Sequence, residues 1–355
     1  MPSNRTTRSG ASHTSDSSHR TRNIIISAGI GAVIIVVCLL FCPFVFMSAK
    51  AQTIVRIPRN ATPEMLTDTL TRHFDADYAS KVMKVFSTFG ADLKERHGAY
   101  TIEEGMSPLQ AGKLLARGQQ TPVKLTINGF RTLDTLADRI SRKFEFSKSD
   151  LLAVLSDSTR LARYGLTPDQ AISLFIDDTY YVYWDATPAD IISKVGQNYD
   201  RVWNSERTAK AKALGITPAQ AMIICSIADE ETQKSDEKGT ITRLYLNRLK
   251  KGMKLQADPT VRYALNDFTI KRVTSAMLGT DSPYNTYRYE GLPPGPIRTT
   301  SVKTIDALLD SEPNPYFYMC AKEDFSGYHN FAETFEEHKE NARRYQQKLN
   351  ELGIK

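Results

Sequence analysis

The stretch TPAQAMIICSIADEET (residues 217–232) carries the clearest folding signal in this chain of 355 residues. Thr217 is a typical helix cap and Pro218 suits the first helical position, after which good helix formers lead to three consecutive acids. Two isoleucines precede Glu231 by seven and four positions, so Glu231 continues the apolar stripe of the predicted helix. One of the three acids is therefore expected to face the protein core.

A carboxyl group on a core-facing stripe loses its hydration, which raises its pKa and lets it hold a proton near neutral pH. Asp229 and Glu230 are rotated from that stripe by roughly 200° and 100°. This pattern makes Glu231 the candidate general acid. The alternative is that the three acids form a solvated helix end with no role in chemistry.

The composition is that of a folded chain, with 41% hydrophobic and 24% charged residues. The formal net charge is +6, and half of that excess lies in residues 1–22. The remainder is too dilute for a nucleic-acid surface, so no such partner is expected. Four cysteines do not make a disulfide scaffold at this length, and Cys225 and Cys320 are expected to be small buried residues.

The N-terminal region predicts a membrane anchor. Residues 1–23 are polar and are predicted to be a disordered cytoplasmic tail. Residues 24–47 contain no charge and exceed the ~20 residues that cross a bilayer as a helix. Arginines before this run, with Lys50 alone behind it, favour a cytoplasmic N-terminus and an extracytoplasmic catalytic domain at the plasma (inner) membrane. The alternative is a cleaved signal peptide, because Ala49-Lys50-Ala51 resembles a cleavage site.

The fold class predicted for the remaining chain is α+β. Residues 48–128 form a small αβ module, with helices capped before Pro63 and Pro108 and short strands at 52–57, 98–102 and 123–127. Residues 129–215 are mainly helical, and residues 216–355 are a catalytic region of helices and short strands. The aromatic run TYYVYW (179–184) fits either a sugar-binding groove or core packing.

Two features near the C-terminus bear on chemistry. The segment SPYNTYRYEGLPPGPI (282–297) predicts a stiff, irregular loop, because three prolines and two glycines fix its backbone in advance. His329 and His338 stand nine residues apart with no nearby cysteine or third ligand, so no metal site is expected. Nothing in the sequence calls for an organic cofactor.

The order and spacing of four segments resemble the YceG-like family of membrane-anchored endolytic murein transglycosylases. The resemblance is dense over residues 225–340 and thinner from 98 to 200. The segments are SIADEETQ (226–233), NRLKKGMKLQADPTVRYAL (247–265), SPYNTYRYEGLPPGPI (282–297) and YFYMCAKEDFSGYHNF (316–331).

The resemblance implies a LysM-like module near the membrane and a catalytic domain that cleaves peptidoglycan between N-acetylmuramic acid and N-acetylglucosamine. It assigns the catalytic role to Glu231, the glutamate directly before Thr232. The chain departs from the family pattern at three places: the earlier acid of the motif is Asp229, a basic residue is replaced by Glu230, and the Phe-Pro-Asp-Thr-Tyr pattern becomes Ile-Asp-Asp-Thr-Tyr (176–180).

A lytic transglycosylase needs one acid that first donates a proton to the leaving oxygen and then accepts one from the muramyl C6 hydroxyl, leaving a 1,6-anhydro end. Nascent strands are the expected substrate, and penicillin-binding synthases and division or elongation proteins are the expected partners. Candidate substrate-binding residues are Gln256, Asp258, Tyr284, Asn285, His329, His338 and Asp229. Two alternatives stay open: a lysozyme-like hydrolase with Asp229 or Asp258 as second acid, and a non-catalytic wall-binding scaffold.

Overall fold

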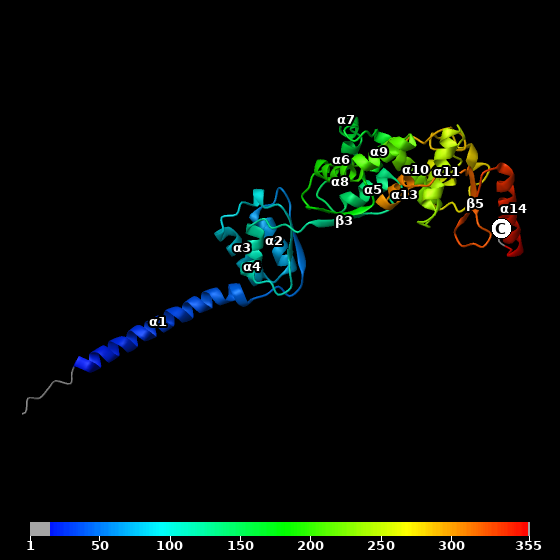
Figure 1. The fold of residues 1–355 in the computed structure, drawn as a ribbon. Helices are drawn as coiled ribbons and strands as arrows, with labels where there is room; N and C mark the ends of the chain where they lie inside the picture. The colour runs from blue at the N-terminus through cyan, green and yellow to red at the C-terminus, as the bar shows by residue number, and fades with distance from the viewer. Residues whose placement is uncertain (1–14, 354–355) are drawn as a thin grey trace, which may run out of the picture. The chain divides into compact units, whose positions relative to one another are not determined.

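The protein is described by a computed structural model for residues 15–353, and its chain divides between Thr121 and Pro122 into two compact units (Figure 1). The fold is α+β, as predicted: within the described residues, helices dominate and the strands pair into three two-stranded antiparallel sheets. Each unit has its own hydrophobic core.

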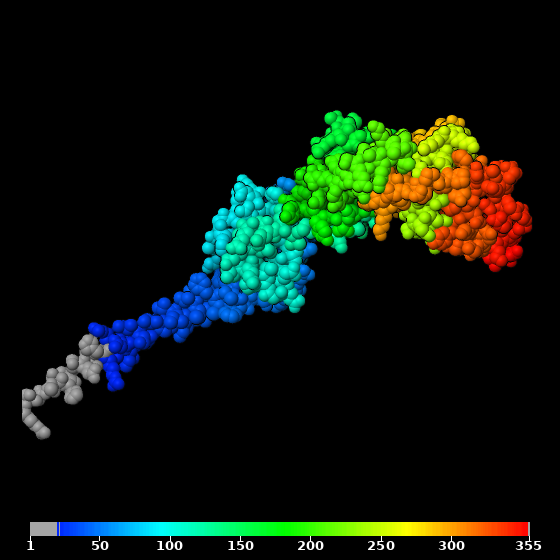
Figure 2. Space-filling view, in the orientation of Figure 1, coloured from blue at the N-terminus to red at the C-terminus, as the bar shows by residue number. Residues whose placement is uncertain are grey.

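The N-terminal helix α1 (Ser15–Phe46) contains an apolar span, Arg22–Phe46, that is long enough to cross a membrane. Its side chains are open to the surroundings along most of the span (Figure 2). Residues 15–23 of the tail predicted to be disordered are helical and belong to α1. The reason is that extending a helix from the apolar span costs little free energy once a first turn has formed. Residues 1–14 of that tail lie outside the described residues.

The rest of the first unit begins with strand β1, and two helices separate β1 from β2, the strand with which it pairs. Its elements are β1 (Thr53–Ile57), α2 (Pro63–His73), α3 (Ala76–Thr88), the 3₁₀ turn η1 (Leu93–Glu95), β2 (Gly98–Ile102) and α4 (Pro108–Ala116). Both predicted caps are present, since Thr62 accepts from the Met65 amide and Ser107 forms a capping box with Gln110. Helix α3 was not predicted from the sequence.

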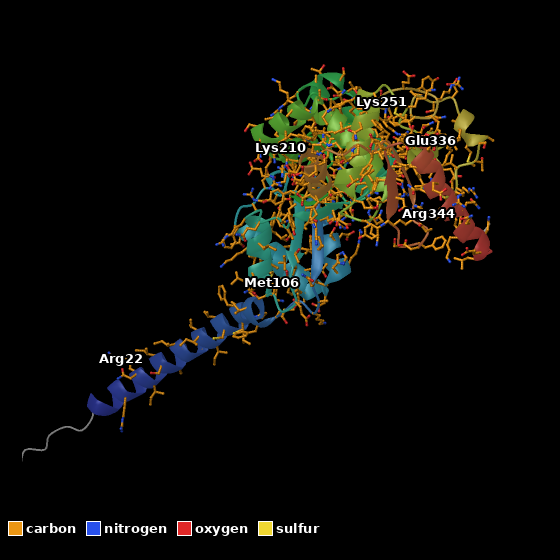
Figure 3. All side chains as sticks on the ribbon, turned by 45° about the vertical axis from the view of Figure 1, so that its right-hand side comes forward. Arg22, Met106, Lys210, Lys251, Glu336 and Arg344 are labelled. Atoms are coloured by element: carbon orange, nitrogen blue, oxygen red, sulfur yellow. The ribbon has the colours of Figure 1, made fainter. Side chains whose placement is uncertain are left out.

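Strands β1 and β2 pair antiparallel, with Val55 opposite Tyr100 and both side chains buried. The N-terminal end of the unit is bound to the loop before α4, which carries Met106 (Figure 3). The Met106 carbonyl accepts hydrogen bonds from Ala49 N at 3.0 Å and from Tyr78 Oη at 2.9 Å. These contacts close a small core around the two strands.

The second unit is mainly helical, with two short two-stranded sheets. Its first half contains β3 (Val123–Ile127), α5 (Leu133–Ser141), α6 (Lys148–Leu155), α7 (Ser158–Ala162), η2 (Pro168–Leu174), β4 (Asp178–Val182), α8 (Pro188–Val202) and α9 (Ser205–Leu214). Its second half contains α10 (Pro218–Glu231), α11 (Lys238–Lys250), α12 (Asp258–Ala264), η3 (Met277–Gly279), α13 (Val302–Leu309), β5 (Tyr318–Ala321), β6 (His329–Ala332) and α14 (Phe335–Glu351).

The predicted boundary after residue 128 is wrong by seven residues. Strand β3 pairs antiparallel with β4, some fifty residues further on, and buries Leu125 and Ile127 in the core of the second unit. Residues 179–182 of the aromatic run thus belong to β4, and burial alternates along them: Tyr180 is buried, whereas Tyr181 is exposed, as is Tyr183 just after the strand. Local sequence pattern could not reveal this long-range pairing.

Helix α10 runs through the centre of the second unit. A capping box between Thr217 and Gln220 begins it, and it packs against α11 and α13. Every residue from Ala221 to Asp229 is buried, so the helix is enclosed on all faces rather than along one stripe. The proline-rich loop at 282–297 has no helix or strand, as predicted, and its Ile297 amide donates to Ser226 Oγ at 3.1 Å beside this helix.

Candidate active site

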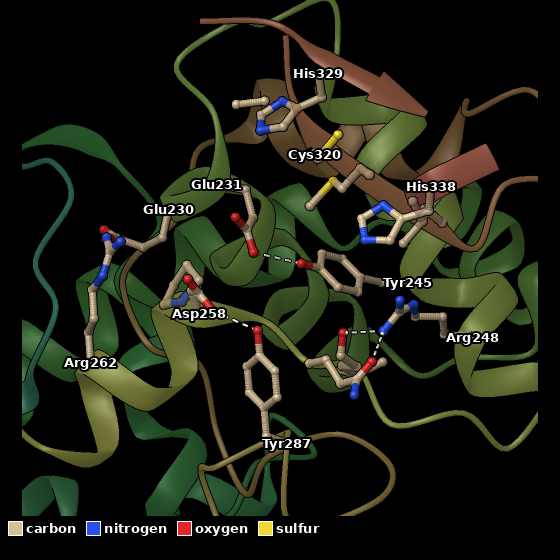
Figure 4. Close-up of a pocket in the computed structure, with 16 residues that line it drawn as sticks. Glu230, Glu231, Tyr245, Arg248, Asp258, Arg262, Tyr287, Cys320, His329 and His338 are labelled. Atoms are coloured by element: carbon tan, nitrogen blue, oxygen red, sulfur yellow. Dashed lines mark hydrogen bonds between the residues drawn. The ribbon is translucent and has the colours of Figure 1, made fainter. Parts of the chain in front are cut away.

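A cavity of about 460 Å³ opens where the C-terminal end of α10 meets α11, α12, β5 and the start of α14 (Figure 4). It brings together residues that are distant in sequence, from Glu231 to His338. Of the predicted site residues, those that line it are Glu231, Gln256, Asp258, His329 and His338. Asp229, Tyr284 and Asn285 lie outside its lining.

Glu231 lies at the last position of α10, with its carboxylate next to Tyr245 of α11. The Tyr245 hydroxyl donates to Glu231 Oε1 at 2.7 Å. Burial raises the pKa of Glu231 to about 7; the Tyr245 hydrogen bond opposes that rise, and the negative charge of Asp258 adds to it. A carboxyl group with this pKa exchanges its proton readily near neutral pH, which is what an acid that must also act as a base requires.

Tyr245 is itself almost fully buried, and burial together with the charge of Glu231 raises its pKa well above the usual value. The phenol therefore keeps its proton at neutral pH and acts as a donor to the carboxylate. This contact fixes the orientation of Glu231 from the neighbouring helix.

The two acids before Glu231 are both bound by basic side chains. Glu230 lines the edge of the cavity, but Arg131 binds both of its oxygens at 3.0–3.1 Å and Arg298 Nη1 lies 3.0 Å from Oε1. Asp229 is 5% exposed and pairs with Lys238 of α11. These pairs fix the C-terminal end of α10 just before its catalytic candidate.

Asp229, a candidate substrate-binding residue from the sequence, lies outside the cavity lining and is held by other contacts. Besides Lys238, its carboxylate accepts hydrogen bonds from Thr300 and, at 2.8 Å, from Thr304 of α13. A buried carboxylate needs such partners because an unpaired one is costly. Asp229 thus links three helices and is not placed to touch a ligand in the cavity.

Asp258 and Gln256 reach the cavity from the segment that leads into α12. The Tyr287 hydroxyl donates to Asp258 Oδ1 at 2.6 Å. Gln256 has φ of +50°, an uncommon backbone conformation for a non-glycine residue, and its amide donates to the Thr286 carbonyl at 3.1 Å. The segment is thus pinned to the loop that carries Tyr287.

The two histidines enter the cavity from β6 and α14. His329 is locked by the buried Glu237, whose Oε1 accepts from the His329 amide at 2.8 Å and whose Oε2 lies 3.1 Å from Nδ1. His338 stacks on Tyr318 with ring centroids 5.4 Å apart, and burial lowers its pKa. Within residues 15–353, no group of three or more His, Cys, Asp or Glu side chains is arranged to hold a metal ion.

Tyr284 and Asn285, predicted to orient the sugar, stabilise the proline-rich loop instead. The Asn285 amide nitrogen donates to the carbonyls of Leu278 and Thr280 at 2.9 and 2.8 Å, and its side chain is fully buried. Tyr284 packs against Tyr263, with ring centroids 4.6 Å apart. Cys320 also differs from expectation, because it is only partly buried and lines the cavity.

Several residues that line the cavity were not predicted: Tyr245, Arg248, Arg262 and Tyr287. A signal for two of them exists in the sequence. Ile241, Leu244, Tyr245 and Arg248 follow one another at i, i+3, i+4 and i+7, which places a tyrosine and an arginine on the apolar stripe of α11. The reasoning that selected Glu231 on α10 also selects these two residues.

Comparisons with known proteins match the chain over most of its length. The model of the YceG-like family matches residues 55–344. An endolytic murein transglycosylase of Bacillus subtilis is 25% identical over 323 residues, covering 85% of this chain and 87% of that protein. One from Streptococcus pneumoniae is 26% identical over 260 residues, covering 65% of this chain, which spans about half (47%) of that relative.

Solved structures give the same assignment. The crystal structure of a yceG-like protein from Listeria monocytogenes matches with a TM-score of 0.55 and 27% sequence identity. The match covers 82% of this chain and 99% of that one. Because the family model covers well over half of the residues and the fold agrees, this chain belongs to the YceG-like family.

Proposed function

We propose that this protein is a membrane-anchored endolytic lytic transglycosylase of peptidoglycan, which cleaves the bond between N-acetylmuramic acid and N-acetylglucosamine and leaves 1,6-anhydromuramyl ends. One observation carries the proposal: Glu231 lines a cavity, its carboxyl group has a pKa of about 7, and the Tyr245 hydroxyl donates a hydrogen bond to it. The names of the relatives in Bacillus and Streptococcus support the same activity.

The proposed reaction uses Glu231 twice. Protonated Glu231 donates its proton to the glycosidic oxygen of the leaving N-acetylglucosamine while the bond from that oxygen to the muramyl C1 breaks. The resulting carboxylate then accepts the proton of the muramyl C6 hydroxyl as the C6 oxygen bonds to C1. The acid is regenerated and no water is consumed. The acetamido group of the muramyl sugar is attached to C2, next to C1, and so can assist the reaction at C1.

A lysozyme-like hydrolase is the second candidate function, and the structure reduces the number of residues that could be its second acid. Such an enzyme needs two carboxyl groups at the scissile bond. Asp229 is engaged by Lys238, Thr300 and Thr304 outside the cavity, so it does not fit this role. Asp258 lines the cavity and is the remaining candidate for a second acid.

Product mass separates these reactions. Purified protein would be incubated with uncrosslinked glycan strands, and the fragments would be analysed by mass spectrometry. The lytic route gives internal cuts with anhydro ends, each fragment being lighter by one water than its hydrolytic counterpart. Fragments with reducing ends would establish the hydrolase. Binding of strands without any cleavage would favour the wall-binding scaffold.

We further infer that the first unit is a LysM-like module that holds glycan. The β1-α2-α3-β2 order, with its antiparallel strand pair around a small core, supports this inference. Pull-down of the full chain on glycan strands, compared with a chain lacking residues 51–121, would test it. Equal retention of both proteins would contradict a binding role for the module.

The proposed setting is the outer face of the plasma membrane, where nascent strands appear. The apolar span of α1 and the arginines before it support an anchor with a cytoplasmic N-terminus. A penicillin-binding synthase is the proposed partner, together with division or elongation proteins. Crosslinking in cells followed by purification of this protein would test the partnership, and recovery without any synthase would count against it.

A further inference from the structure

Arg248 carries a buried positive charge in the cavity that no acid neutralises. Its side chain extends from α11 into the cavity lining and is only 7% exposed as a residue. Its hydrogen bonds go to neutral acceptors: Nε to the Phe317 carbonyl at 2.5 Å, and Nη1 to the carbonyls of Lys254 and Leu255 at 3.0 and 2.9 Å. Nη1 also donates to the side-chain oxygen of Gln256 at 3.2 Å.

These contacts hold the guanidinium in place without cancelling its charge. In the described part of the chain, no carboxylate lies within ion-pair distance of Arg248, and Nη2 has no hydrogen-bond acceptor. A buried, unpaired charge is costly, and burial accordingly lowers the pKa of Arg248. A residue of this kind is expected where a ligand supplies the missing anion.

His338 adds a second free polar atom on the same side of the cavity. Its Nδ1 is buried and, among the described residues, has no hydrogen-bond partner. The Tyr318 ring links the two residues, since the Arg248 guanidinium lies 5.3 Å from its centroid and His338 stacks on it. Figure 4 shows Arg248 and His338 together on one side and Glu231 and Asp258 on the other.

The cavity therefore has one part, with Glu231 and Asp258, where chemistry is proposed, and another part, with Arg248 and His338, that has no assigned role. We propose that Arg248, with His338 beside it, binds a carboxylate carried by the lactyl-peptide substituent of the muramyl sugar. This inference rests on the proposed function. A guanidinium suits such a group because it binds carboxylates through parallel hydrogen bonds. The pair would fix which sugar lies on which side of Glu231.

The carboxylate has two sources in the proposed substrate: the free lactyl group of a sugar without a peptide, and the peptide stem. The test uses the full chain in detergent with Glu231→Gln, so that ligands are not cleaved. Calorimetry would compare muramyl-containing tetrasaccharides that differ only at one group: a free lactyl carboxylate, its primary amide, a stem with free carboxylates, and a stem with those carboxylates amidated.

We expect one of the two carboxylate ligands to bind about tenfold or more tightly than its amide, because hydrogen bonds between ionised partners are stronger than those between neutral ones. Tenfold in affinity corresponds to about 1.4 kcal/mol. The ligand that shows the preference identifies the source. Adding Arg248→Met should abolish the preference, whereas Arg248→Lys should retain part of it. Circular dichroism would verify that each variant is folded.

Arg262 provides the matched control. It lines the other part of the cavity, also has no carboxylate within ion-pair distance among the described residues, and donates to the Lys271 carbonyl at 3.3 Å. Loss of the preference with Arg262→Met and not with Arg248→Met would overturn the assignment to Arg248. If the Glu231→Gln protein, with Arg248 unchanged, binds the carboxylate and amide ligands equally well, the proposal of a carboxylate site is wrong. Failure to bind every muramyl ligand would contradict the proposed function as well.

Discussion

At the scale of single residues, the surroundings of Glu231 set the pKa of its carboxyl group. Burial pushes the pKa of its carboxyl group up to about 7, and the Tyr245 hydroxyl limits that rise by donating to the ionised form. The balance matters because a stronger acid would already have lost its proton at neutral pH and would form a carboxylate that accepts the C6 proton poorly, whereas a weaker acid would donate its proton poorly to the leaving oxygen. Tyr245 is thus a positioning residue with a measurable electrostatic effect.

Tyr245→Phe should move the alkaline limb of the pH profile of kcat/KM to higher pH. Removing the donor destabilises the carboxylate relative to the neutral acid, so Glu231 stays protonated to a higher pH. The rate below the limb should fall about tenfold, since one orienting hydrogen bond of about 1.4 kcal/mol is lost.

Tyr287→Phe is the matched control, because Tyr287 donates to Asp258 and makes no hydrogen bond to Glu231. Its alkaline limb should stay closer to that of the wild type. A limb that moves to lower pH in Tyr245→Phe would contradict the assigned role of the tyrosine.

Glu231→Gln should change how stability depends on pH. In the wild type the folded-state pKa of Glu231 is raised above its ordinary value of 4.5, so the folded state binds the proton more tightly than the unfolded state. This contribution is fully present below pH 4.5 and is lost as pH rises through about 7. Relative to wild type, the variant should therefore gain up to about 3 kcal/mol in unfolding free energy between pH 4.5 and pH 8.

Urea unfolding followed by tryptophan fluorescence would measure this difference, because Trp184 and Trp203, the two tryptophans of the chain, both lie in the second unit. A difference between the two proteins that stays constant across this pH range would show that the carboxyl group titrates normally.

The sequence predicts Glu231 and misses its partners for a physical reason. Glu231 is set apart by its position relative to two isoleucines on one helix, which is local information. The neighbours Tyr245 and Arg248 carry a similar helical signal, but which helix faces Glu231 depends on tertiary packing. The fixed roles of Asp229 and Asn285 depend on contacts with Thr304 and Leu278 that sequence spacing does not encode.

At the scale of secondary structure, helix α10 is secured at both ends. The capping box at Thr217 satisfies its first backbone amides, and the ion pairs of Asp229 and Glu230 fix its last turn. Because Glu231 follows directly, its side chain enters the cavity from a rigid support. Such preorganisation is what a catalytic acid requires, since small displacements lower the rate strongly.

Strand β3 should decide whether the second unit is stable alone. A fragment beginning at residue 122 retains β3, whereas one beginning at residue 129 loses Leu125 and Ile127 from the core and leaves β4 unpaired. The shorter fragment should be destabilised by about 3–6 kcal/mol, from two fully buried aliphatic side chains. Urea midpoints would measure this loss.

A fragment beginning at residue 117 is the control, since its five extra residues belong to the first unit. It should unfold with the same midpoint as the fragment from residue 122. Equal midpoints for the fragments from residues 122 and 129 would show that β3 contributes nothing to this core.

Most helices were predictable because their starts are marked locally. Thr62-Pro63, Ser107-Pro108 and Thr217-Pro218 each begin a helix as expected. Pairing was not predictable, since β3 and β4 are separated by helices that the chain must traverse first. Helix α3 was missed although Asp75 is a common cap residue, because no proline follows it and its side chain makes no capping hydrogen bond.

At the scale of the whole molecule, an apolar helix, a small αβ unit and a larger catalytic unit follow one another along the chain. The apolar span leaves its side chains exposed, which is stable only in an apolar surrounding such as a bilayer. The activity proposed here would thereby be confined to strands near the membrane surface.

The anchor predicts a defined protease sensitivity. In spheroplasts, added protease should degrade residues 48–355 while an N-terminal tag stays protected, because the arginines before the span favour a cytoplasmic N-terminus. A cytoplasmic enzyme would serve as the control for membrane integrity. Protection of the catalytic unit would contradict this orientation, and a mature N-terminus at Ala51 would indicate a cleaved signal peptide.

The most direct test of the central claim is the mass of the products formed from glycan strands by wild type, Glu231→Gln and Asp258→Asn. If Glu231 alone is the acid and base, wild type and Asp258→Asn will give internal cuts with 1,6-anhydro ends, and Glu231→Gln will give none. Anhydro products from Glu231→Gln, or reducing ends from the wild type, would contradict the claim.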